Sequence, residues 1–142
     1  MSNTSNESST ESLFGKVIST YSRAQAIEDG VLIDAGAMTS EAGFKWPVAL
    51  TAAVWADCVA WSEDDSRRQI YQDESGRWWD VLYMASHAIR TSNDSGDRLL
   101  FKLYRVPRDG HSLEAALVTL RLIVGPGDTG EPVITILQPH ED

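Results

Sequence analysis

The sequence predicts an α+β domain in which N-terminal helices pack on one face of a three-stranded antiparallel sheet formed by the C-terminal third. In the first two thirds of the chain, apolar residues recur with helical spacing, whereas after residue 98 their period becomes twofold. A block of helices followed by a block of strands is typical of this fold class. A sheet of three strands also needs a cover on one face, which the helices would supply.

Length and composition fit one folded unit. The chain has 142 residues, of which 42% are hydrophobic and 23% charged, close to ordinary globular usage. Residues 1–11 are mainly Ser, Asn, Thr and Glu, a composition that cannot bury much apolar surface. We therefore expect a disordered tail over residues 1–11 and a single α+β domain over residues 12–142.

Short elements are expected in the first third of the chain. Ser22 can cap a helix over residues 23–29, and Gly30 can supply the left-handed conformation that ends it. The apolar run 31–33 is too short for a helix and predicts a strand or a buried extended segment. A second helical fragment is expected over residues 37–42.

The segment after Pro47 predicts a central helix over residues 47–61. Proline is favoured at a first helical position, and strong helix formers follow it. Leu50, Cys58 and Trp61 would share one apolar stripe, and the near absence of charge places this helix in the core. Cys58 is accordingly expected to be a buried core residue, where burial would suppress its nucleophilicity.

A polar connector and a third helix follow. The connector 62–75 contains SEDDSRRQ, which can add one charged helical turn. Ser75 is placed to cap the third helix, whose apolar stripe includes Trp78 and Leu82. Residues 91–97 are a loop by composition.

The last third of the chain predicts the sheet. Residues 99–106, 116–124 and 133–137 are rich in β-branched and apolar side chains, and the first two segments alternate with polar ones. PRDG at 107–110 is a turn that joins the first two strands into an antiparallel pair. GPGDTGEP at 125–132 joins the second and third strands, since it lacks the Lys and the following helix of a phosphate-binding loop.

Charge and cysteine content bound the partners and the compartment. The 21 acidic and 12 basic residues give a formal charge of −9, which disfavours direct nucleic-acid binding. Cys58 is the single cysteine, so no intrachain disulfide can form, which fits a reducing compartment. Because neither a secretory leader nor a membrane-spanning stretch is visible, we expect a cytoplasmic protein of a bacterial host that binds no membrane.

The sequence predicts no catalytic residue, metal site or cofactor. His87, His111 and His140 are too far apart in the chain to form a ligand pair such as H-x-x-x-H. Carboxylates do gather around the connector and could in principle face one another, but their spacing lacks the order of a calcium loop. A solvated acidic rim is the favoured interpretation. These carboxylates are Asp57, Glu63, Asp64, Asp65, Asp73 and Glu74.

The segment GRWWD at 76–80 carries two successive tryptophans, which point about 100° apart on a helix. If Trp78 enters the core, Trp79 lies on a neighbouring face beside Tyr83 and near Arg90. A Trp-Tyr-Arg patch has the composition of an interface hot spot. The alternative is that the sheet or the N-terminal segment covers this face, and both interpretations stay open.

A family resemblance covers roughly residues 14–142. The runs DGVLIDAG, GFKWPVALTAAVWADCV, DESGRWWDVLYMA, FKLYRVPRDG and GPGDTGEPVITILQPHED resemble a family of small uncharacterised acidic proteins encoded on bacterial plasmids, integrative elements and prophages. The family has no established activity, so no functional residue carries over. The resemblance implies a setting in which small acidic proteins often antagonise host defence, by occupying basic surfaces or separating subunits.

The leading hypothesis is a non-enzymatic protein-binding module, an inhibitor of a host defence complex of the anti-CRISPR or antirestriction type. It would engage a basic protein surface through the acidic residues above together with Trp79 and Tyr83. One alternative is an enzyme of unknown reaction that uses Asp73, Glu74 or Asp80 with Arg77. The other is a self-associating accessory protein of plasmid or phage maintenance.

Overall fold

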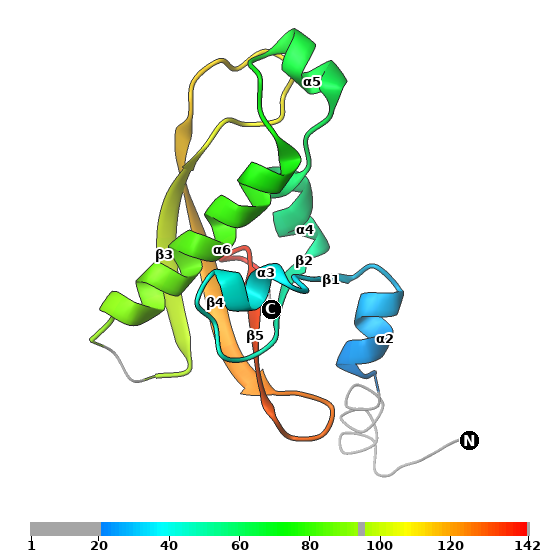
Figure 1. Ribbon diagram of the computed structural model, residues 1–142, viewed down its shortest axis with the longest axis vertical. Coiled ribbons are helices and arrows are strands. Elements are labelled where there is room, and N and C mark those ends of the chain that lie inside the picture. Colours follow the sequence, from blue (N-terminus) through cyan, green and yellow to red (C-terminus); the bar gives the residue numbers. More distant parts are fainter. Residues whose placement is uncertain (1–20, 94–95, 142) are drawn as a thin grey trace.

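The structure, a computed structural model, describes residues 21–93 and 96–141 (Figure 1). The tail predicted over residues 1–11, and the first part of the domain predicted over 12–142, lie outside these residues. Helices and one mixed sheet form an α+β architecture, in which the long helix α6 lies across one face of the sheet.

The elements follow the predicted succession of short helices, a long helix and a final set of strands. The helices are α2 (Arg23–Glu28), α3 (Met38–Glu41), α4 (Ala52–Val54), the π-helix η1 (Trp55–Val59), α5 (Glu63–Arg68) and α6 (Glu74–Thr91). The strands are β1 (Leu32–Asp34), β2 (Val48–Thr51), β3 (Arg98–Arg105), β4 (Ala116–Pro126) and β5 (Pro132–Leu137).

The sheet has five strands in the order β1-β2-β5-β4-β3, so the predicted number of three is wrong. The C-terminal part is confirmed, because β3, β4 and β5 form the expected antiparallel meander. Two N-terminal strands extend it: β2 pairs parallel with β5, and β1 pairs antiparallel with β2. As a result β1 and β3 are the two edges.

The predicted helix over residues 47–61 is wrong in its first part. Residues Val48–Thr51 form β2, which lies between β1 and β5, and Val48, Ala49 and Leu50 are fully buried. A central strand buried on both faces reads as a continuous apolar run, which periodicity alone cannot distinguish from a buried helix. Helical structure begins only after Thr51, whose side chain caps α4.

Serine caps explain where two of the helices begin. Ser22 caps α2 and Ser62 caps α5, each in a reciprocal arrangement with the side chain three residues later. Gly30 follows α2 with a φ of 80°, as predicted. The predicted cap of α6 at Ser75 is wrong by two positions, because the helix begins at Glu74 with Asp73 as the preceding residue.

One core lies between α6 and the sheet. From α6 it receives Trp78, Val81, Leu82 and Ala85, and the facing sheet residues include Leu50, Phe101, Leu120 and Ile136. Trp55 packs edge-to-face on Trp78, with ring centroids 4.8 Å apart. Cys58 is 1% exposed, as predicted, and burial raises its pKa to about 11.

Within residues 21–93 and 96–141, no helix combines the length and the apolarity that a membrane span requires.

Candidate protein-binding surface

Helix α6 organises the surface because its 18 residues run the length of the core. Its inner side carries Trp78, Val81 and Leu82, all buried. Trp79 lies next to Trp78, is half-buried and packs against the margin of the core, and Tyr83 one turn later is 44% exposed. Side chains at i and i+4 lie one above the other on a helix, so Trp79 and Tyr83 belong to one outer stripe.

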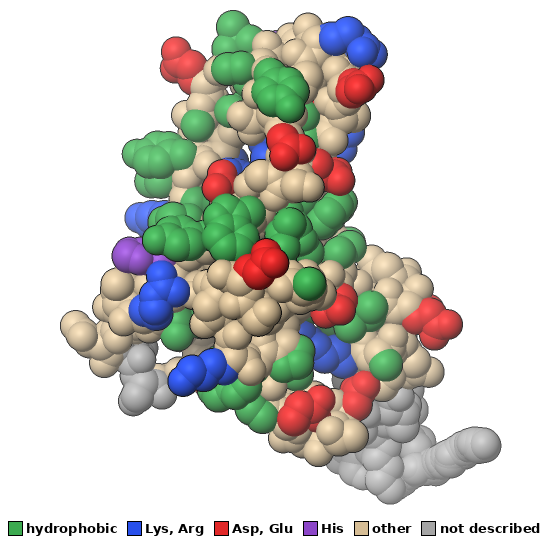
Figure 2. Space-filling model, viewed as in Figure 1, with side chains coloured by type: hydrophobic (Ala, Val, Ile, Leu, Met, Phe, Trp, Pro, Cys, Tyr) green, Lys and Arg blue, Asp and Glu red, His purple; other side chains and the backbone are tan. Residues whose placement is uncertain are grey.

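An aromatic row follows this stripe. The rings of Trp79 and Tyr83 stack with centroids 6.2 Å apart, and the rings of Tyr83 and His87 stack at 6.4 Å. The guanidinium carbon of Arg90 lies 5.8 Å from the Tyr83 ring centroid. Figure 2 shows hydrophobic side chains gathered across the middle of this face, over and beside α6. We call Trp79, Tyr83 and His87 the aromatic row.

Three of the predicted carboxylates line a single hollow of about 440 Å³ between α5 and the beginning of α6. They are Glu63, Asp73 and Glu74, and we call this site the acidic hollow. Arg67 and Tyr71, which is 78% exposed, also line it. Glu74 accepts a hydrogen bond from the backbone N–H of Trp61 at 3.3 Å. The carboxylates of Glu63 and Asp73 have no partner in the part of the chain that the structure describes.

The other three predicted carboxylates have partners within the protein. Asp64 forms ion pairs with Arg67 at 3.5 Å and Arg68 at 3.0 Å. Asp65 accepts a hydrogen bond from the backbone N–H of Ser62 at the start of α5 and pairs with Arg108 at 2.7 Å. Asp57 accepts a hydrogen bond from Gln138 Nε2 at 2.8 Å and does not line the acidic hollow. The eight predicted site residues therefore divide into the acidic hollow, the aromatic row and these three engaged carboxylates.

A groove runs along the edge of the sheet, between α6 and β3. It consists of two hollows of about 310 and 450 Å³, which share Met84 and Lys102 in their walls. Tyr83 and His87 contribute to the α6 side, whereas Leu100 and Tyr104 contribute to the β3 side. We call it the edge groove.

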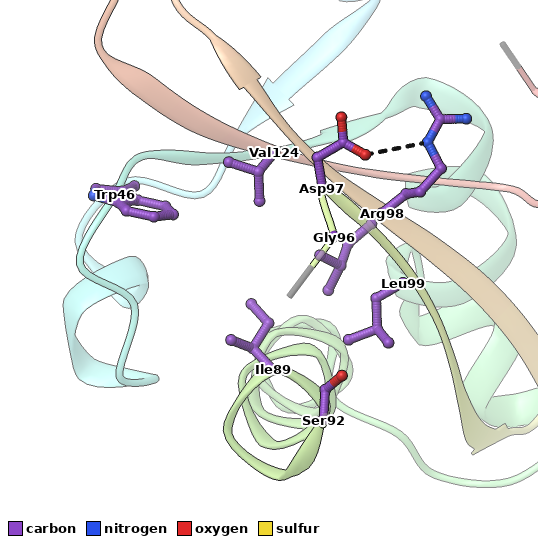
Figure 3. A pocket seen from close by; sticks show the side chains of 9 residues that line it. Trp46, Ile89, Ser92, Gly96, Asp97, Arg98, Leu99 and Val124 are labelled. Atoms are coloured by element: carbon purple, nitrogen blue, oxygen red, sulfur yellow. Dashed lines mark ion pairs between the residues drawn. The ribbon is translucent and has the colours of Figure 1, made fainter. Parts of the chain in front are cut away.

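A further hollow of about 370 Å³ lies at the C-terminal end of α6 (Figure 3). Its apolar walls include Trp46, Ile89, Leu99 and Val124, and the Asp97–Arg98 ion pair at 3.6 Å lies at its rim. Because Leu99 also lines the edge groove, this hollow adjoins the groove. Side chains of this kind accommodate an apolar group and provide no nucleophile-base pair.

Two buried arginines hold the η1 end beneath this surface. Arg77 Nε donates to the carbonyl oxygen of Val59 at 3.1 Å, and Arg105 Nη1 donates to that of Cys58 at 2.9 Å. These carbonyls close a π-helix, in which the N–H of Ala60 donates to Trp55 O. Burial, and then the charge of Arg105, lower the pKa of Arg77 to about 10, so it stays protonated at neutral pH.

The residues of the enzymatic alternative are not assembled as that hypothesis requires. Asp80 pairs with Arg105 at 2.9 Å. Arg77 faces the interior, where its guanidinium carbon lies 4.6 Å from the ring centroid of Trp61. It does not line the hollow that contains Asp73 and Glu74. Within the described residues, no group of three His, Cys, Asp or Glu side chains is placed to hold a metal ion.

Sequence reasoning missed the residues of the edge groove. The signal was present, since Leu100, Lys102 and Tyr104 alternate on β3 with the buried Phe101 and Leu103. Alternation predicts that these three residues share one face, but it does not show that β3 is an edge strand. That fact depends on the strand order of the whole sheet.

Fold and surface together define an α+β protein with an aromatic helix face, an acidic hollow and an open sheet edge. The chain belongs to a family of unknown function, DUF6573, whose family model matches residues 12–142. No curated protein and no solved structure matches the chain.

Proposed function

We propose that this protein is a non-enzymatic protein-binding module that contacts its partner through the acidic hollow and the aromatic row. The exposure of Tyr83, stacked between Trp79 and His87 on α6, is the observation that carries the proposal. Aromatic residues are enriched at the centres of protein interfaces because they bury a large area at low entropic cost.

The acidic hollow suits a basic side chain of the partner. Glu63 and Asp73 have no internal partner among the described residues, so an incoming Lys or Arg meets carboxylates that are not already neutralised. Tyr71 at the rim can cover such a side chain. Charge complementarity of this kind speeds association and selects the partner more than it adds affinity.

The setting of this function remains part of the proposal. An inhibitor of a bacterial host defence complex, acting in the cytoplasm without touching nucleic acid directly, agrees with the charge of −9 and with the resemblance described above. The partner would then present a basic protein surface. Self-association and catalysis stay as alternatives that the same experiments can address.

Charge reversal tests the electrostatic part. In an affinity pull-down from a bacterial extract at low salt, we expect the double variant Glu63→Lys/Asp73→Lys to retain less partner than the unmodified protein. The amount of retained partner should fall by a factor of about ten or more. The difference should shrink in high salt, because screening weakens exposed charge pairs.

A matched control separates local charge from net charge. Glu28→Lys/Glu41→Lys makes the same change in net charge at two exposed carboxylates on α2 and α3. This control should retain the partner in full. Equal retention by both double variants would show that the acidic hollow does not contact the partner.

A further inference from the structure

We propose that β3 accepts an extended, acidic segment of a partner protein as an additional strand of the sheet, held in the edge groove. The inference rests on the proposed function in one respect, namely that the occupant is a protein. It adds the conformation of the bound segment, its hydrogen bonds and the chemical character of its side chains.

The hydrogen-bond pattern of β3 leaves one set of backbone groups pointing away from the sheet. The N–H of Val124 donates to the carbonyl of its direct partner Asp97 at 2.8 Å. Bonded pairs alternate along an antiparallel ladder, so the pairs that include Leu99, Phe101 and Leu103 are also bonded. The N–H and C=O groups of Leu100, Lys102 and Tyr104 therefore point outward.

An independent contact agrees with this assignment. The carbonyl of Tyr104 accepts a hydrogen bond from Arg105 Nε at 2.9 Å, as expected of a carbonyl that is not used in the ladder to β4. The outward N–H groups of Leu100, Lys102 and Tyr104 and the outward carbonyls of Leu100 and Lys102 have no partner among the described residues. These five groups are what an added strand would bond.

The edge has little of the usual protection against strand addition. Natural edge strands are often short, bulged, interrupted by proline or marked by a lysine, and of these features β3 has only Lys102. By contrast, β3 is eight residues long, contains no proline, and pairs with β4 in unbroken register from Arg98 to Arg105. Leu100 and Tyr104 are 59% and 66% exposed.

Helix α6 supplies a wall for one side of the added segment. Side chains of a strand alternate between its two faces, so every second residue of the segment would point toward α6. There it would enter the two hollows of the edge groove beside Met84 and Ala88. The intervening residues would lie beside Leu100, Lys102 and Tyr104.

Local charge identifies the segment as acidic. The charged walls of the edge groove are Asp80, which Arg105 neutralises at 2.9 Å, and Lys102, which has no partner in the described part of the chain. His87 lies on the opposite wall. A carboxylate beside Lys102 is therefore favoured, whereas a second copy of this chain would bring another Lys102 to the same edge. The expected segment alternates apolar and acidic residues.

Peptide selection on the full chain provides the probe. We would pan a phage-displayed library of random peptides on the 142-residue protein and synthesise the selected sequences. The selected peptides should alternate Val, Ile or Leu with Asp or Glu. On binding, amide hydrogen exchange should slow at Leu100, Lys102 and Tyr104 and stay unchanged at Phe101 and Leu103.

Proline substitution tests the backbone contact. Leu100→Pro removes an outward N–H and costs no bond to β4, so it should weaken peptide binding by at least about tenfold without loss of fold. The matched control is Asp34→Pro on β1, the opposite edge strand. Because Ala35 and Val48 form a hydrogen-bonded pair, the N–H of the neighbouring residue Asp34 also points outward. This control should bind like the unmodified protein. Circular dichroism would verify that both variants fold.

The outcomes separate this inference from the proposed function. Peptides that lose binding with Tyr83→Ser but keep it with Leu100→Pro would overturn strand addition and leave the protein-binding function standing. Selection of no peptide, or of Lys- and Arg-rich peptides, would also overturn the inference. So would a concentration-dependent dimer that Leu100→Pro abolishes, because the edge would then belong to a second copy.

Discussion

Arg77 and Arg105 are basic residues in a place where charged side chains are seldom found. Both are nearly inaccessible, and their hydrogen bonds go mainly to backbone carbonyls at the end of η1 and the beginning of the β3–β4 connection. A cation at a helix C-terminus interacts favourably with the unpaired carbonyls there. These two residues thus fasten η1, α6 and β3 to one another.

Removal of one of these guanidinium groups should be costly. Arg105→Met removes one hydrogen-bond donor from each of the carbonyls of Cys58 and Arg77 and removes the cation that pairs with Asp80. We expect a loss of about 3 kcal/mol in the free energy of unfolding, measured by urea denaturation. Arg67→Met removes an exposed pair and should change this free energy by less than about 1 kcal/mol. Similar losses for the two variants would contradict the structural role of Arg105.

The thiol of Cys58 provides a second test at this scale. Its pKa is raised to about 11 by burial, so at pH 8 the group is protonated in the folded protein and also inaccessible. A thiol reagent such as Ellman's reagent should react slowly in buffer and fully in denaturant. Rapid reaction in buffer would show that the core around η1 opens easily.

At the residue scale the sequence predicted the burial of Cys58 but not the buried arginines, and it left open whether the face that carries Trp79 is covered. Arg77 stands four positions before Val81 and so lies on the apolar stripe of α6, which was a usable signal. Its partners are carbonyls distant in sequence, and no residue pattern marks a carbonyl that needs a donor.

At the scale of elements, the segment after Pro47 shows how a non-local partner overrides local preference. VALTAAV suits a helix by propensity, yet Val48, Ala49 and Leu50 pair with Ile134, Thr135 and Ile136 across the sheet. The meander β3-β4-β5 was predictable because each turn is local and the alternation is clear. The parallel pairing of β2 with β5 joins segments far apart in the chain and leaves no local signal.

Proline at Ala49 distinguishes a strand from a helix in this segment. In a helix that begins at Pro47, residue 49 is in the first turn and tolerates proline; in a central strand it loses a ladder hydrogen bond. We expect Ala49→Pro to cost about 3 kcal/mol or more in unfolding free energy. Glu63→Pro, at the first position of α5 after an extended Ser62, should change it by less than about 1 kcal/mol. Tolerance of proline at both positions would refute β2.

At the scale of the whole molecule, charge is distributed unevenly. Figure 1 shows α5 at the end of the molecule, near the β3–β4 connection. The acidic hollow lies beside α5, whereas the edge groove with Lys102 runs along β3. The net charge of −9 predicted an acidic surface but not this separation. The separation arises because Arg67, Arg68 and Arg108 neutralise part of the connector. Which carboxylates remain unpaired depends on tertiary contacts.

The most direct test of a partner-binding face on α6 is site-specific photo-crosslinking in living bacteria. A benzophenone amino acid replaces Tyr83 in one variant and Val31, exposed beside the opposite edge strand, in another. We expect a discrete covalent adduct with another protein from position 83 and none from position 31. No adduct at position 83, or the same adducts at both positions, would contradict a partner-binding face on α6.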